Sequence, residues 1–137
     1  MNSVSVSRRL DAPTTTVRDA MFDLEPFVRS AGFDEVTVDG DTINVANQVG
    51  PIRIELTLAI VDDPAGDLTY EQREGIFETM RTTYVLSERP DGTEVVATTE
   101  FALDLTLIGE FLDATIIKRQ RRVELTAQLD YLESATR

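Results

Sequence analysis

The sequence predicts an α+β domain in which a curved antiparallel sheet of about six to seven strands wraps around one long carboxy-terminal helix. Three observations support this class. The chain has 137 residues, the size of one domain. Turn residues divide its middle into short segments of alternating hydrophobicity, and the last segment, from about residue 107 to 133, contains no proline. Only that helix is long enough to cover the apolar face of the sheet, so we expect one domain over residues 1–137.

The first strand and two short helices are expected at the amino-terminal end. The opening segment SVSVSRRL alternates small polar and apolar residues, which predicts a strand that ends near Pro13. The segment TTTVRDAMFDLEPFVRSAG follows, with apolar residues three and four positions apart. Pro26 lies within it and lacks the N–H group that a helix interior needs. We therefore predict two short helices that meet near Pro26, the second of which ends at Gly32.

The middle of the chain, from Phe33 to about Leu103, is expected to form about six strands separated by turn signals such as Gly50-Pro51. The strand after Pro51 alternates most regularly. Its predicted inward row is Ile52, Ile54, Leu56, Leu58 and Ile60. Both faces of the strand over residues 93–103 are partly apolar, so either face is compatible with contact to the helix.

The composition excludes several classes of function. The chain has 25 acidic and 13 basic residues, a formal net charge of -12, and one lysine, Lys118. This acidic, lysine-poor composition resembles that of proteins from salt-accumulating halophiles, whose charged surfaces stay hydrated at high salt. It argues against a nucleic-acid partner, because affinity for phosphates depends on Lys and Arg.

Cysteine and histidine are both absent. Thiolate nucleophiles, disulfides, imidazole bases and most zinc or iron ligand sets are thereby excluded, and we expect no metal and no cofactor. No apolar run approaches the roughly 18 residues of a membrane-spanning helix, and no signal-peptide pattern is present. We expect a cytoplasmic protein without membrane insertion.

Three stretches resemble the START-like or SRPBCC superfamily, in particular its polyketide cyclase/dehydrase-like branch and the small stand-alone members found in halophilic archaea. They are SVSVSRRLDAPTTTVRDAMFD, LTYEQREGIFETMRTTYVLSERPDGTEVVATTEF and IIKRQRRVELTAQLDYLES. The resemblance covers essentially the whole chain and implies the helix-grip fold. It also implies a cavity between the sheet and the long helix that holds an apolar or amphipathic small molecule.

The final helix carries the basic motif KRQRR. On a helical wheel its apolar arc contains Leu107, Ile108, Phe111, Leu112, Ile116, Val123, Leu125, Leu129 and Leu132. Lys118, Arg119 and Arg122 fall in the same arc. Arg121 lies at its edge, while Asp113, Ile117, Glu124 and Gln128 point away. An inward cation needs a partner or a wet cavity, so the wheel predicts a polar region beneath the helix.

We interpret this region as the polar end of a ligand cavity. Its predicted polar members are Tyr70, Gln72, Glu74, Tyr84, Arg119 and Arg122, and its predicted apolar members are Leu56, Leu58, Met80, Phe101 and Ile116. The alternative is that the arginines fasten the helix by pairing with carboxylates such as Glu71, Glu74, Glu78 or Glu100. The segment 105–108 beside Gly109 is a candidate mouth or simply the packed start of the helix.

The sequence favours a module that binds a hydrophobic or amphipathic small molecule, such as a lipid, a quinone or a polyketide-like compound. One alternative is a cyclase- or dehydratase-like enzyme that uses Glu74, Tyr84 and the helix arginines, with Glu74 or Tyr84 as the general acid or base. Against it, no nucleophile–base pair, phosphate-binding glycine loop or metal spacing is present. A third possibility is a ligand-free protein that acts through partners, for example as a homodimer.

Overall fold

The computed structural model describes residues 1–104 and 113–137. Its elements follow the predicted order. They are β1 (Asn2–Leu10), α1 (Thr14–Phe22), α2 (Leu24–Arg29), β2 (Glu35–Asp39), β3 (Thr42–Val49), β4 (Ile52–Val61), β5 (Leu68–Glu74), β6 (Phe77–Arg89), β7 (Gly92–Leu103) and α3 (Ala114–Ala135). The predicted first turns of the long helix, residues 107–112, and the candidate mouth at 105–108 lie outside the described residues.

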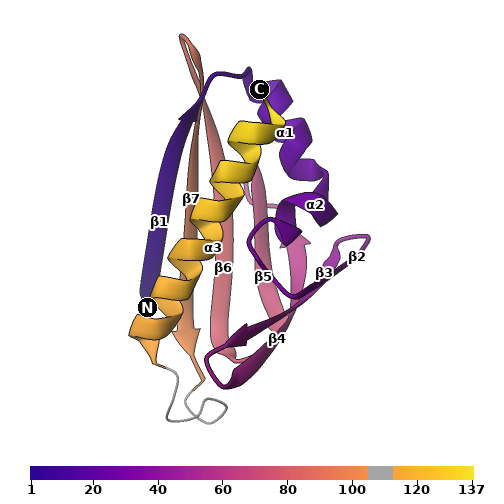
Figure 1. The fold of residues 1–137 in the computed structure, drawn as a ribbon, viewed down its shortest axis with the longest axis vertical. Coiled ribbons are helices and arrows are strands. Elements are labelled where there is room, and N and C mark those ends of the chain that lie inside the picture. The colour runs from indigo at the N-terminus through magenta and orange to yellow at the C-terminus, as the bar shows by residue number, and fades with distance from the viewer. Residues whose placement is uncertain (105–112) are drawn as a thin grey trace.

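Within the described residues, seven strands form one antiparallel sheet in the order β1-β7-β6-β5-β4-β3-β2. Each strand after β2 pairs with the preceding one, and β1 pairs with β7, so β1 and β2 are the two edge strands. α3 lies along the inner face of this curved sheet, and α1 and α2 lie beside the carboxy-terminal half of α3 (Figure 1). The backbone of α3 lies closest to β1. The predicted α+β helix-grip architecture is confirmed.

The two short helices meet where proline chemistry predicts a break. α1 ends at Phe22 and α2 begins at Leu24, so Pro26 lies in the first turn of α2, where its missing N–H breaks no helical hydrogen bond. Gly32 follows the end of α2 with a φ of 102°, a left-handed conformation that glycine adopts without strain. The chain can therefore turn directly from α2 into β2.

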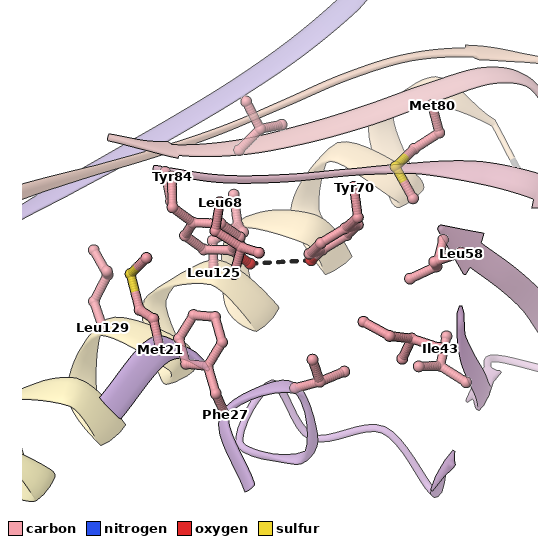
Figure 2. Packing of buried hydrophobic residues seen from close by; sticks show 14 of the residues in the cluster. Met21, Phe27, Ile43, Leu58, Leu68, Tyr70, Met80, Tyr84, Leu125 and Leu129 are labelled. Atoms are coloured by element: carbon pink, nitrogen blue, oxygen red, sulfur yellow. Dashed lines mark hydrogen bonds between the residues drawn. The ribbon is translucent and has the colours of Figure 1, made fainter. Parts of the chain in front are cut away.

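The core lies between the inner face of the sheet and the three helices. Figure 2 shows Met21 and Phe27, from α1 and α2, packed with Leu125 and Leu129 of α3 near the ring of Tyr84. The rings of Phe27 and Tyr84 meet edge to face with centroids 5.2 Å apart, a favourable aromatic geometry. The short helices therefore close one end of the space beneath α3.

The inward face of β7 is settled by burial. Thr93, Val95, Ala97, Thr99 and Phe101 are all buried and form one alternating row. On β6 the row of Met80, Thr82 and Tyr84 is buried, so the predicted cavity residues Met80 and Tyr84 point inward.

The inward row predicted on β5 is correct at Tyr70 and wrong at Glu74. Leu58 of β4 pairs with Gln72, and the residue just before it, Thr57, pairs with Glu74. Arg73 is therefore an extra residue in the β5 strand. Such a bulge interrupts the period-two alternation and turns the residues beyond it to the other face. Glu74 is accordingly exposed on the same side as Thr57.

The orientation predicted for α3 is wrong by part of a turn. Val123, predicted inward, is 58% exposed, and Lys118, Arg119 and Arg122 are also exposed. The inward stripe of the described helix consists of Ile117, Arg121, Glu124, Leu125, Gln128, Leu129 and Leu132. The helical wheel was oriented by its apolar residues alone. It therefore placed Glu124 and Gln128 outside and Arg121 at the edge, although all three are buried.

Candidate functional site

Three polar side chains of α3 lie in the interior. Arg121 is 7% exposed, Glu124 3% and Gln128 1%. Their spacing of three and four residues places them on one helical face, in register with the buried Ile117 and Leu132. Because buried polar groups must be paired, each needs partners from the sheet or from neighbouring helices.

Glu124 is the centre of the first polar group. One of its oxygens, Oε1, accepts a short hydrogen bond from Nη1 of Arg121, and the two side chains form a buried ion pair. The other oxygen, Oε2, accepts from Nδ2 of Asn47 at 3.2 Å and from Nε2 of Gln120 at 2.9 Å. Both carboxylate oxygens are therefore occupied by protein donors.

The guanidinium of Arg121 is only partly satisfied. Its Nη2 donates to Oγ1 of Thr82 at 3.2 Å, and Thr82 in turn shares a hydrogen bond of 2.9 Å with Thr99. Burial by itself lowers the pKa of Arg121, but the charge and hydrogen bond of Glu124, together with the neighbouring Tyr70 and Tyr84, raise it above its ordinary value. Arg121 is thus a permanent cation. Its Nε atom is buried and contacts no hydrogen-bond acceptor among the described residues.

A second polar group joins three layers of the structure. Tyr84 donates a short hydrogen bond to Oε1 of Gln128, and the hydroxyls of Tyr70 and Tyr84 lie 3.0 Å apart (Figure 2). Because Tyr84 has one proton and gives it to Gln128, Tyr70 is the donor in the tyrosine pair. Nε2 of Gln128 then donates to the carbonyl of Phe27 at 3.4 Å. The chain of bonds links β5, β6, α3 and α2.

Tyr84 is held in its neutral form. Burial raises the pKa of Tyr84 well above its ordinary value, and the neighbouring Tyr70 raises it further. A phenol in this state donates a hydrogen bond and does not act as a base near neutral pH.

An interior pocket adjoins the Arg121–Glu124 pair. Its described lining consists of Phe33, Val45, Asn47, Val49, Ile54, Leu56, Phe77, Ile117, Gln120, Arg121 and Glu124. Its volume is about 30 Å³, enough for one or two water molecules and about a tenth of the space of the smallest usual ligand sites. Phe33 and Gln120 are its half-buried members, so the solvent side lies near them.

Two larger, open hollows lie at the surface of the described structure. One, of about 390 Å³, lies over β2–β4 and includes Glu35, Glu55 and Glu74. Another, of about 410 Å³, lies between Phe22 and the loop around Asp63. Neither contains the polar groups buried beneath α3.

Six of the predicted cavity residues are buried in the interior: Leu56, Leu58, Tyr70, Met80, Tyr84 and Phe101. Ile116 is half-buried and packs against the core. Leu56 lines the interior pocket, whereas Tyr70 and Tyr84 belong to the second polar group. The structure therefore brings the predicted apolar and aromatic members together.

The remaining predicted polar members lie elsewhere. Arg119 is exposed, and Arg122 is exposed and donates a hydrogen bond of 3.4 Å to the carbonyl of Ser5 on β1. Gln72 is half-buried, and its amide bonds both backbone groups of Phe77, which closes the turn between β5 and β6. Glu74 faces the surface hollow over β2–β4.

Sequence reasoning missed Arg121, Glu124, Gln128 and Asn47. A signal for the first three was their spacing of three and four residues in register with Ile117, Leu125 and Leu132. The signal for Asn47 was its position between Val45 and Val49, a polar residue in an otherwise apolar row with a period of two.

Within the described residues, no three Asp or Glu side chains gather closely enough to hold a metal ion. No helix of this part of the chain is long and apolar enough to cross a membrane.

Comparison with solved structures places this geometry in a known architecture. A protein from Thermus thermophilus superposes with a TM-score of 0.76 at 19% identity, over 98% of this chain and 97% of that one. A START superfamily protein from Mycobacterium smegmatis gives a TM-score of 0.68 at 15% identity, over 98% and 96% of the two chains. The chain has the START-like fold.

The Zhui aromatase/cyclase from a Streptomyces species has the same START-like fold, with a TM-score of 0.73, 19% identity and coverage of 99% and 96% of the two chains. No family model matches the sequence, and no curated protein matches it either. At these identities the likeness establishes the START-like fold alone.

Proposed function

We propose that this chain binds a hydrophobic or amphipathic small molecule between α3 and the β3–β4 side of the START-like sheet. The observation that carries the proposal is the interior pocket, whose walls are mostly apolar and whose floor is the Arg121–Glu124 pair with Asn47. Small-molecule sites usually combine such walls with a few convergent polar groups. A ligand larger than one or two waters requires the pocket to widen.

The enzymatic alternative has less support. A polyketide-type cyclase or dehydratase reaction that uses Glu74 and Tyr84 would need both at one substrate. Glu74 faces the surface hollow over β2–β4, whereas Tyr84 is buried beneath α3. The relation to the Zhui aromatase/cyclase is one of fold. Tyr84 as a neutral donor remains the candidate acid of such a reaction.

The third alternative, a ligand-free protein that acts through partners or as a homodimer, is favoured by one observation, the pocket volume of about 30 Å³. A cytoplasmic location and a halophilic origin stay predictions from composition.

The test is native mass spectrometry of the purified protein, followed by thermal-shift screening of lipids, quinones and polyketide-like compounds. We expect a bound or stabilising compound. Val49→Phe fills the pocket and should abolish binding of the compound and the thermal stabilisation that it causes. The matched control Val85→Phe, on the opposite face of the sheet, should abolish neither. Failure of every compound to bind wild-type protein would support the ligand-free alternative.

A further inference from the structure

The charges that face the interior pocket cancel. Among the described residues of its lining, the charged ones are Arg121 and Glu124, and they form an ion pair with each other. Both oxygens of Glu124 already accept hydrogen bonds from Arg121, Asn47 and Gln120. A second carboxylate or a phosphate would therefore enter a site in which Arg121, the cation of the described lining, is already neutralised.

Such an anion would be disfavoured on two grounds. It would lose its hydration in a mostly apolar pocket, and it would lie beside the Glu124 carboxylate. A ligand cation is disfavoured by the adjacent guanidinium of Arg121 for the same reasons. The electrostatics of the pocket thus select a neutral molecule.

One buried donor atom of the pocket side chains has no partner at all among the described residues. Nε of Arg121 is buried and has no acceptor among the described residues, whereas Nη1 and Nη2 bond Glu124 and Thr82. Buried polar atoms without a partner are rare, and each calls for an explanation such as an unseen water or a ligand. A neutral oxygen of a ligand would supply the missing acceptor without adding charge.

We propose that the molecule bound beside α3 is uncharged and presents a hydroxyl or carbonyl oxygen to Nε of Arg121, with its apolar part against the walls of the pocket. This inference rests on the proposed function. Nε lies within the packed interior and the present volume is about 30 Å³, so the ligand would displace neighbouring side chains, among them the apolar ones on the side of Phe33, to reach it.

The test compares two probes that differ only in the head group, 1-decanol and decanoate, at about pH 8, where the acid is ionised. Binding to wild-type protein is followed by nitrogen-15 NMR, with the Nε–H resonance of Arg121 as the local reporter. We expect 1-decanol to bind at least about tenfold more tightly than decanoate and to shift that resonance.

Glu124→Gln sharpens the test, because it leaves an amide in place but removes the charge that neutralises Arg121. In this variant we expect the preference to move toward decanoate by at least about tenfold. The matched control is Glu133→Gln, which removes a charge from the same helix outside the pocket and should leave the wild-type ratio unchanged.

The outcomes separate the two proposals. Decanoate binding to wild-type protein as tightly as 1-decanol, or 1-decanol binding without any shift of the Arg121 resonance, overturns the inference and leaves the proposed function standing. If neither probe nor any compound of the thermal-shift screen binds, the proposed function is overturned as well. Should Glu124→Gln fail to fold, the wild-type ratio and the Arg121 resonance still decide.

Discussion

Replacement of Arg121 by methionine perturbs the interior of this protein at its most charged point. Arg121→Met keeps a long side chain beneath α3 but leaves the Glu124 carboxylate, whose side chain is 4% exposed, with only the amides of Asn47 and Gln120 as partners. Breaking a buried ion pair from one side typically costs about 3–5 kcal/mol. Since domains of this size are stable by about 5–15 kcal/mol, the loss is roughly a fifth or more of the total.

The double variant Arg121→Met/Glu124→Leu removes both charges together. Its remaining cost is that Nδ2 of Asn47 and Nε2 of Gln120 lose their acceptor, about 1–3 kcal/mol for the buried Asn47, offset by the added apolar packing. We therefore expect the double variant to be more stable than Arg121→Met, with a coupling energy of about 2 kcal/mol or more between the two positions.

The assay is thermal and urea unfolding followed by circular dichroism, at one fixed salt concentration for all variants. Arg121→Met should lower the melting temperature by roughly 10–15 °C for a domain of this length. Arg119→Met is the control, because Arg119 is exposed on the same helix and its loss should change stability by less than about 0.5 kcal/mol. An Arg121→Met protein as stable as this control would refute the buried pair, and a double variant no more stable than Arg121→Met would refute the coupling.

Four further outcomes follow from the structure. Because burial raises the pKa of Tyr84, the folded state keeps a proton that the unfolded state loses above about pH 10, so stability should fall as the pH rises past that value, and Tyr84→Phe should lessen the fall. Gly92→Ala should destabilise by about 2 kcal/mol or more, since φ is 152° and a Cβ atom would lie 1.9 Å from the carbonyl oxygen of Leu10. Asp113→Ala should cost about 1 kcal/mol, because Oδ1 of Asp113 accepts from the backbone N–H of Ile116 at 2.9 Å. With a net charge of -12, the protein should unfold at a higher urea concentration in about 1 M KCl than in about 0.1 M KCl.

The first two of these outcomes have a further check. Absorbance of tyrosinate during an alkaline titration shows whether one phenol stays protonated until the protein unfolds. Gly40→Ala is the control for Gly92→Ala, because Gly40 has a φ of 60° but nothing within 4 Å of an added Cβ, so it should cost less. An alkaline titration in which all three tyrosines ionise together near their ordinary pKa, with the fold intact, would contradict the burial of Tyr84.

The elements of the sheet could be predicted because each depends on local chemistry. Turn residues fixed where the strands end, and the period of two along β4 marked Ile54, Leu56 and Leu58 as inward. The break near Pro26 followed from the missing N–H of proline. These features need no knowledge of distant neighbours.

The prediction failed where one residue's environment depends on another segment. The bulge at Arg73 is visible only in the pairing of β5 with β4, and it turned Glu74 away from the predicted cavity. Its effect was to separate Glu74 from Tyr84, the two residues of the enzymatic hypothesis.

The sequence by itself determined that this chain is an acidic α+β domain without cysteine or histidine chemistry, in which a long helix covers one face of the sheet. Only the tertiary structure decided which cation of KRQRR lies inside. Arg121 is tolerated there because Glu124, one turn later, and Thr82, from β6, meet its guanidinium. Burial of a polar side chain is set by the partners that pay its desolvation cost, and those partners come together only in the folded chain.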